Sequence, residues 1–365
     1  MAGIYISYPF CSQKCTYCNF ASGVLPRELE PRYTRALASE LAASEWPSTP
    51  DTVYLGGGTP SLMDPATLSA LLHAIPGQHI ETTLEVAPGG ISSERAHAWS
   101  HAGINRVSLG VQSFVATELA RAGRKHSAEI VQSEVAILRN TGVHNFNLDL
   151  IAGLPGQTAA SWSESLDWVE RLAAPHVSVY MLEVDEDSRL GKEMLGLGQR
   201  YGAATVPSDD QIAGFYETAV ERLARAGVAR YEISNFAQPG RESRHNLKYW
   251  RRDPYLGFGA DAHSFDGVWR WQNAESAGDY VTLIENGQSP VVERTAADAT
   301  AERFFLGLRL ADGIPEGREE PFGDAISHFV REGLLERVRG RVRLTPRGIL
   351  LSNEVFAEFI GAPVS

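Results

Sequence analysis

Strand-like and helix-like segments alternate along the chain, and this alternation is the feature that most restricts its fold. Apolar, strand-like runs occupy residues 3–8, 52–55, 82–86, 105–111, 145–151 and 176–182. Longer runs with helical spacing of apolar residues lie between them, at 30–46, 92–102, 127–140 and 161–173. Strands separated by helices at this spacing are parallel strands with helical crossovers. The pattern predicts the α/β class, with helices packed against one parallel sheet.

Polar residues and glycines stand where several of these predicted strands end. They are Gly56, Gly57, Gly58, Glu85, Gln112 and Asp149. In an α/β barrel the carboxyl ends of the strands line the active site. We therefore expect these residues to meet at one end of a barrel. The alternative is that each is polar simply because its strand leaves the core there.

Composition and charge exclude some classes of protein. The chain has 365 residues and a formal net charge of −12, and an acidic surface disfavours nonspecific binding to nucleic acid. No apolar run reaches the roughly 20 residues of a membrane-spanning helix, and the first residues do not resemble a secretory signal. We expect a cytoplasmic protein, with peripheral association at a membrane as a further option.

The C-terminal part departs from the strand–helix alternation of the rest of the chain. We predict three regions: a barrel over 1–240, a connecting region over 241–300 and a C-terminal domain over 301–365. Helical runs at 301–310 and 324–332 precede a predicted hairpin around Gly340 and a last helix. This order is similar to a winged-helix module. The hairpin carries alternating arginines, Arg337, Arg339, Arg341 and Arg343, which we interpret as a solvated face rather than a nucleic-acid contact.

Three cysteines, Cys11, Cys15 and Cys18, stand within eight residues directly after the first predicted strand, and the chain has no others. An odd, crowded set is not a disulfide framework and indicates a metal site. Three thiolates can hold a 4Fe–4S cluster and leave one iron without a protein ligand. That open iron can bind a chelating substrate such as S-adenosylmethionine (SAM), whose C–S bond an electron from the cluster can cleave. A zinc site is the alternative, but a structural zinc site needs four ligands, and Phe20 stands where another ligand would come.

The cysteine motif Cys-x3-Cys-x2-Cys, with Tyr17 before the last cysteine, resembles the signature of the radical SAM superfamily. Further matching segments follow in order: Tyr5-Ile-Ser-Tyr-Pro-Phe-Cys11, Gly56-Gly-Gly-Thr-Pro-Ser, Leu84-Glu-Val-Ala-Pro, Val107-Ser-Leu-Gly-Val-Gln-Ser-Phe and Leu148-Asp-Leu-Ile-Ala-Gly-Leu-Pro-Gly-Gln. Together they resemble the oxygen-independent coproporphyrinogen III oxidase-like branch over nearly the whole chain. The resemblance implies a partial (β/α)6 barrel. Ser7 replaces the family's usual histidine before the cluster motif.

The resemblance also implies a set of SAM-binding residues: Tyr5, Tyr17, Gly57, Gly58, Thr59, Glu85, Gln112, Arg124 and Asp149. Their chemistry suits these roles. Glycines let the ligand approach the backbone closely, and the arginine can hold a carboxylate through two parallel hydrogen bonds. Without the resemblance, the glycines could serve a tight turn alone, and Arg124, followed by Lys125 and His126, would be an ordinary basic surface cluster.

A second motif lies beyond the predicted barrel strands, at His245-Asn246-Leu-Lys-Tyr249-Trp250. An imidazole can ligate haem iron and aromatic rings can pack on a porphyrin. Chemistry alone favours a packed aromatic loop in which His245 is a hydrogen-bonded core residue. The motif, however, is similar to the His-Asn-x-x-Tyr-Trp signature of the HemW-type haem chaperone subgroup, and this implies that His245, Asn246, Tyr249 and Trp250 contact haem.

Three functions are compatible with these patterns. The first is a haem chaperone that carries a 4Fe–4S cluster, binds SAM and haem, and passes haem to client proteins, including membrane respiratory enzymes. The second is oxygen-independent coproporphyrinogen III dehydrogenase, against which the short N-terminus and Phe20 argue, and the third is a class C radical SAM methyltransferase. We assign no catalytic residue, and we leave open SAM cleavage, enzymatic activity and homodimer formation. A doubly wound sheet is the alternative fold, but the sequence lacks its phosphate-binding glycine loop.

Overall fold

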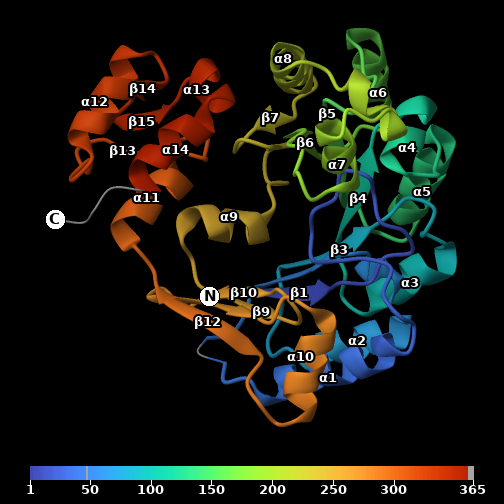
Figure 1. The fold of residues 1–365 in the computed structure, drawn as a ribbon. Coiled ribbons are helices and arrows are strands. Elements are labelled where there is room, and N and C mark those ends of the chain that lie inside the picture. Colours follow the sequence, from blue (N-terminus) through green and yellow to red (C-terminus); the bar gives the residue numbers. More distant parts are fainter. Residues whose placement is uncertain (47, 361–365) are drawn as a thin grey trace.

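The computed structural model describes residues 1–46 and 48–360 and contains fifteen strands within them (Figure 1). The strands are β1 (Gly3–Tyr8), β2 (Thr52–Gly57), β3 (Glu81–Val86), β4 (Arg106–Gln112), β5 (Asn145–Ala152), β6 (His176–Met181), β7 (Ala229–Arg230), β8 (Asn235–Ala237), β9 (Tyr255–Phe258), β10 (His263–Phe265), β11 (Trp269–Asn273), β12 (Val291–Ala296), β13 (Ile314–Pro315), β14 (Leu335–Val338) and β15 (Arg341–Leu344).

Fourteen α-helices and two short 3-10 helices, η1 (Pro60–Leu62) and η2 (Arg200–Thr205), occur in the same described residues. The α-helices are α1 (Leu29–Ala43), α2 (Pro65–His73), α3 (Ser93–His101), α4 (Ala116–Ala122), α5 (Ala128–Asn140), α6 (Ala159–Arg171), α7 (Arg189–Leu195), α8 (Asp209–Arg225), α9 (Arg244–Arg251), α10 (Ala277–Glu285), α11 (Ala299–Gly307), α12 (Gly323–Arg331), α13 (Pro346–Leu350) and α14 (Ser352–Ile360). None of the helices in this part of the chain is long and apolar enough to cross a membrane.

The main sheet follows the order β12-β11-β10-β9-β1-β2-β3-β4-β5-β6-β8-β7. Strands β1 to β6 are parallel and lie side by side in chain order. A doubly wound sheet reverses its strand order at a switch point, and β1 to β6 have no such reversal. The alternative fold is therefore wrong, and the predicted α/β partial barrel is confirmed.

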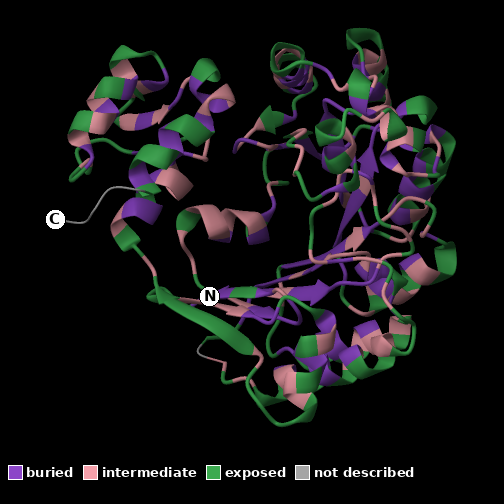
Figure 2. Ribbon diagram, in the orientation of Figure 1, coloured by how far each residue is buried: buried purple, intermediate pink, exposed green. Residues whose placement is uncertain are grey.

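The two faces of β1 to β6 differ in chemistry, because successive side chains of a strand point to opposite faces. The outer face is apolar and lies under the helices; it carries Ile4, Ile6, Val53, Leu55, Leu84, Val107, Leu109, Leu148, Leu150, Val177 and Val179, all almost completely buried (Figure 2). The inner face is polar and carries Tyr5, Tyr54, Thr83, Glu85, Arg106, Ser108, Asn147, Asp149, His176 and Ser178. The sheet thus encloses an interior of hydrogen-bonding groups.

Residues from the predicted connecting region extend the same sheet. Strand β9 pairs parallel to β1, and β10, β11 and β12 follow in antiparallel order. Helix α9 lies between the barrel and the C-terminal module in Figure 1, and it contacts both β2 and α11. The three domain boundaries remain a prediction.

The C-terminal module has the element order α11, β13, α12, β14, β15, α13 and α14. Its small sheet has the order β13-β15-β14, and three phenylalanines, Phe304, Phe322 and Phe359, pack together in its core with ring centroids 4.8–5.4 Å apart. Residues 361–365 of the predicted domain lie outside the described residues. The likeness to a winged helix remains a prediction.

Three of the four hairpin arginines make contacts within the module. Arg337 pairs with Glu319, and Arg343 donates to Glu336 at 2.7 Å. Arg341 donates to the carbonyl oxygen of Gly313 at 2.6 Å. These intramolecular contacts favour the interpretation of the hairpin as a solvated face.

Candidate cofactor pocket and the His245 helix

The cysteine loop joins β1 to α1 and is held by backbone hydrogen bonds at both ends. Cys11 N donates to the carbonyl oxygen of Gly23 at 2.8 Å, and Gly23 N donates to that of Pro9 at 2.9 Å, so the loop closes on itself. Thr16 N donates to Ala122 O at 3.2 Å, which fastens the middle of the loop to the end of α4. The cysteines therefore stand on an anchored loop above the carboxyl ends of the strands.

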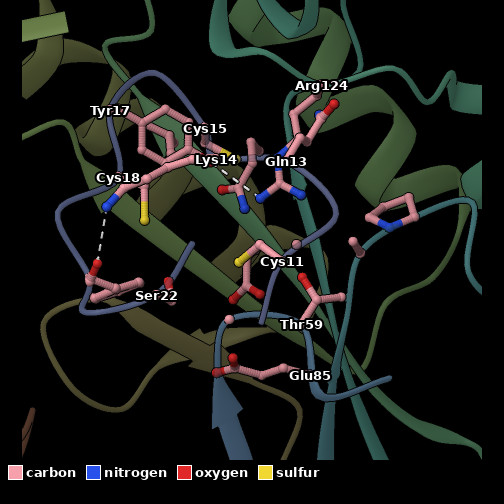
Figure 3. Close-up of a pocket in the computed structure, with 18 of the residues that line it drawn as sticks. Cys11, Gln13, Lys14, Cys15, Tyr17, Cys18, Ser22, Thr59, Glu85 and Arg124 are labelled. Carbon is pink, nitrogen blue, oxygen red and sulfur yellow. Dashed lines mark hydrogen bonds between the residues drawn. The ribbon is translucent and has the colours of Figure 1, made fainter. Parts of the chain in front are cut away.

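A cavity of about 600 Å³ lies between this loop and the strand ends. This volume is typical of small-molecule and cofactor sites. All three cysteines line it, and in Figure 3 Cys11, Cys15, Cys18, Glu85 and Arg124 surround one open space. The loop and the strand ends, far apart in the sequence, thus form a single pocket.

The cysteines fit a multi-iron cluster better than a single ion. In residues 1–46 and 48–360, no three His, Cys, Asp or Glu side chains converge on one metal position. Cys11, Cys15 and Cys18 instead share a cavity wall, and each is partly exposed. A structural zinc ion needs a closed tetrahedral set. Three spaced thiolates facing an open cavity are what a 4Fe–4S cluster with one free iron requires.

The glycine loop after β2 has a physical reason to lack side chains. A Cβ on Gly58 would lie 2.7 Å from the carbonyl oxygen of Phe10, which is closer than real Cβ contacts. Gly57 has φ +105°, a conformation that favours glycine. Gly57, Gly58 and Thr59 all line the cavity, so the loop presents backbone to it.

Two partly buried carboxylates reach the pocket from the inner face of the sheet. Glu85 accepts from Tyr54 Oη at 2.8 Å and from Gly57 N at 3.2 Å, and burial raises the pKa of its carboxyl to about 7. Asp149 accepts from Ser108 Oγ at 3.1 Å and from Asn147 Nδ2 at 2.7 Å, and burial raises its pKa as well. Both carboxylates are held in place by neutral donors.

Arg124 and Gln112 meet over Gly110. A Cβ built on Gly110 would lie 3.1 Å from Gln112 Nε2 and 3.5 Å from Arg124 Nη2, so both side chains cross this glycine. Arg124 Nη2 donates to Tyr17 Oη at 3.4 Å, while its buried Nε has no hydrogen-bond partner among the described residues. A guanidinium with a free donor beside the cysteines suits a ligand carboxylate.

Eight of the nine expected SAM residues line this pocket: Tyr17, Gly57, Gly58, Thr59, Glu85, Gln112, Arg124 and Asp149. Tyr5 is outside its lining and instead stacks on Tyr54, with ring centroids 6.2 Å apart. Sequence reasoning missed Tyr54, Ser108 and Tyr180, which also line the pocket. The alternation of side chains along a strand could have identified them, because residues two apart share a face. Tyr54 is two residues from Gly56, Ser108 from Gly110, and Tyr180 from Ser178.

The second motif forms α9, and its histidine is buried beneath the barrel. His245 is 1% exposed; its Nδ1 hydrogen-bonds Thr52 Oγ1 at 3.0 Å and its Nε2 hydrogen-bonds Tyr249 Oη at 2.8 Å. Burial lowers the pKa of the imidazole to about 3, so the ring is neutral. Buried Glu81 accepts from the backbone N–H groups of Arg244 and His245 and fixes the start of the helix.

The rest of the motif lies on other sides of α9. The guanidinium of Arg309 stands 4.3 Å from the Trp250 ring, which connects α9 to the C-terminal module. Asn246 N donates to the helix-capping Ser243 Oγ at 3.3 Å. The structure therefore brings His245 and Tyr249 together, and it places His245, Asn246, Tyr249 and Trp250 outside the lining of the cysteine pocket.

Comparisons with known proteins agree with this geometry. Residues 5–169 match the radical SAM superfamily, and residues 295–351 match the HemN C-terminal domain. Proteins named "Heme chaperone HemW" include one from Bacillus subtilis, 34% identical over 99% of this chain and 100% of that protein. Another, from Mycobacterium tuberculosis H37Rv, is 35% identical over 98% of this chain and 95% of that protein.

The solved structure of coproporphyrinogen III oxidase (HemN) from Escherichia coli, a radical SAM enzyme, matches with a TM-score of 0.81. It is 21% identical and the match covers 99% of this chain and 90% of that one, which shows a common fold. The identity to these two HemW proteins is higher, 34% and 35%, and covers 100% and 95% of their length. The match to the radical SAM superfamily covers the cysteine loop. This chain therefore belongs to the HemW family of radical SAM proteins.

Proposed function

We propose that this chain is a haem chaperone that carries a 4Fe–4S cluster and binds SAM. The observation that carries the proposal is its similarity, over the full length, to proteins named as haem chaperones. Helix α9, which bears His245, Asn246, Tyr249 and Trp250, supports it, because these residue types suit haem. The fold shared with the oxidase does not by itself favour the oxidase reaction.

In this proposal Cys11, Cys15 and Cys18 hold the cluster, and Arg124 binds the carboxylate of SAM. Gly57, Gly58 and Thr59 admit the amino acid part of SAM close to the backbone, while Glu85, Gln112 and Asp149 bind its amino and ribose groups. Tyr17 forms an aromatic wall of the pocket. A bound cluster supplies the electron that cleaves SAM if cleavage occurs. Tyr5, the ninth residue proposed for the SAM site, stacks on Tyr54 of the pocket lining.

Ligation of haem by His245 requires a rearrangement. Both ring nitrogens are already hydrogen-bonded, to Thr52 and to Tyr249, and the ring is buried. Iron can take one nitrogen only when α9 releases it. A neutral imidazole is the form that ligates iron, and burial keeps the His245 ring neutral until the helix releases it. A helix that opens to bind and closes to release suits a protein that transfers its cargo.

The finer parts of the function are proposals too. Client proteins are haem-requiring proteins, including membrane respiratory enzymes. We propose that the chain acts in the cytoplasm and meets such clients at the membrane surface. A homodimer stays a further proposal that size measurement of the cluster-loaded protein would test.

An anaerobic haem titration of the reconstituted protein, followed by visible absorbance, tests the proposal. We expect saturable, stoichiometric binding, with an altered spectrum and weaker affinity for His245→Ala. His263→Ala is the matched control, because His263 is exposed on β10. Absence of saturable binding by the wild-type protein would remove the chaperone function.

A further inference from the structure

A continuous set of contacts joins the cysteine pocket to α9 through one side chain, Tyr54. Its hydroxyl donates to Glu85 Oε1 at 2.8 Å, inside the pocket. Its ring lies against the imidazole of His245, with centroids 5.3 Å apart and planes inclined by 31°. Tyr54 is partly buried on the inner face of β2 and belongs to the pocket lining at the same time. One residue thus touches both regions.

Strand β2 supplies a second contact to the same imidazole. Thr52, two residues before Tyr54, hydrogen-bonds His245 Nδ1 at 3.0 Å. Residues two apart on a strand share a face, so both side chains point into the barrel. The next residue on this face is Gly56, where an added Cβ would lie 3.1 Å from Glu85 Oε1. The inner face of β2 therefore connects His245 to the carboxylate in the pocket.

We propose that Tyr54 is a positioning residue that couples the two regions: SAM bound against Glu85 holds Tyr54, and with it His245, in the docked arrangement, so SAM and His245-ligated haem each weaken the binding of the other. This inference rests on the proposed function, since it assumes SAM in the pocket and haem on His245. It assigns a role to a residue for which the sequence motifs have none.

The direction of the coupling follows from charge. SAM carries a sulfonium and an amino group, and positive charge near Glu85 favours its ionised form. An ionised acceptor makes a stronger hydrogen bond to the Tyr54 hydroxyl than a protonated one. The pKa of about 7 means that both forms of Glu85 are present near neutral pH, so a bound cation changes their balance. A more firmly held Tyr54 keeps its ring against His245 and opposes release of the helix.

Thermodynamic linkage makes the effect reciprocal. If SAM weakens haem binding by some factor, haem weakens SAM binding by the same factor. Haem would then leave more readily when SAM occupies the pocket, which gives the pocket a part in haem transfer without SAM cleavage.

The test is a set of haem titrations with and without saturating SAM, under anaerobic conditions and without reductant so that SAM stays intact. We expect SAM to raise the haem Kd of the wild-type protein by about fivefold or more, the lower end of typical couplings. In Tyr54→Phe, which keeps the ring and loses the hydroxyl, the ratio of the two Kd values should fall to about one. Tyr216→Phe is the matched control, because Tyr216 is a buried tyrosine on α8 outside the lining of the pocket, and its ratio should stay at the wild-type value.

The outcomes separate coupling from structural support. A Tyr54→Phe variant that shifts both Kd values equally, leaving their ratio unchanged, would show that Tyr54 is only a structural residue. A wild-type protein that binds haem identically with and without SAM would overturn the inference and leave the haem chaperone proposal intact.

A second measurement covers the case in which haem binding itself fails. Hydrogen–deuterium exchange reports the opening of α9 directly. We expect SAM to slow exchange over residues 244–251 in the wild-type protein and to leave it unchanged in Tyr54→Phe. Equal exchange of the wild-type helix with and without SAM would overturn the coupling, whatever happens with haem.

Discussion

The cysteine pocket and the His245 helix stand at opposite ends of the same strands, and one side chain from each, Arg124 and His245, differ in how far their hydrogen-bonding groups are satisfied. In the pocket the buried Arg124 Nε has no partner within the described residues, and the cysteines are partly exposed. In α9 both nitrogens of His245 are hydrogen-bonded and the ring is covered. The pocket is thus arranged to receive a ligand as it stands, whereas the helix is arranged to hold itself closed.

This difference indicates which of the two regions must lose existing hydrogen bonds before a ligand can bind. A ligand in the pocket adds hydrogen bonds to groups already in position. Haem at His245 first requires that hydroxyls of Thr52 and Tyr249 lose their partner, which costs about 1–3 kcal/mol for each group left buried and unpaired. Haem binding at α9 would therefore be weaker than its contacts alone suggest, which fits the proposed function of passing haem on.

The largest expected effect is on the pocket side. Cys15→Ala removes one of three thiolates, and we expect loss of the iron content and of the brown absorbance of anaerobically purified protein. Ser12→Ala, an exposed position in the same loop, should retain both. If Cys15→Ala kept its iron, the cysteine loop would not be the cluster site, and the contrast between an open cofactor pocket and a closed helix would fail.

The next effect is on the helix side. His245→Ala leaves Thr52 and Tyr249 without their partner and opens a cavity, so we expect the free energy of unfolding to fall by about 2–4 kcal/mol. Urea denaturation of the cluster-free and haem-free protein measures it, with His263→Ala as the exposed control. A change below about 0.5 kcal/mol, typical of surface substitutions, would show that α9 is not held closed by this side chain.

The smallest effect concerns protonation in the pocket. Burial raises the pKa of Glu85 to about 7, so the carboxyl is mostly protonated at pH 6 and mostly ionised at pH 8. Because SAM is cationic near this group, its affinity should rise with pH, by up to about tenfold between pH 6 and 8 if only the ionised form binds. Calorimetry at both pH values measures the rise, and Glu85→Gln should flatten it. A pH-independent Kd in the wild-type protein would place SAM away from Glu85.

Much of the fold was predictable because it depends on local patterns. The runs around 3–8, 145–151 and 176–182 became strands close to their predicted bounds. Crossover spacing predicted their parallel order. The four strands between Tyr255 and Ala296 were missed, because short strands that pair with β1 from far along the chain have no local signal of their partner.

The candidate site divides in the same way. Cys11, Cys15 and Cys18 stand together in the sequence, so their chemistry is readable from spacing alone. Arg124 follows an ordinary helix and shows no local sign of a ligand role; only the fold brings it over Gly110, beside Tyr17. Tyr5 and Tyr54 show what sequence patterns cannot distinguish. Both are tyrosines on the inner face of the sheet, but only Tyr54 lines the pocket.

The sequence by itself determined the α/β class, the three-thiolate motif and the family, because these depend on periodicity, spacing and motif order. The tertiary structure decided what surrounds each group. It buried His245 and gave both of its nitrogens partners from β2 and α9, and it placed Tyr54 between the imidazole and Glu85. Burial and hydrogen-bond satisfaction arise from residues distant in the chain, and for that reason no local pattern could show that one end of the barrel is open to a ligand and the other is closed.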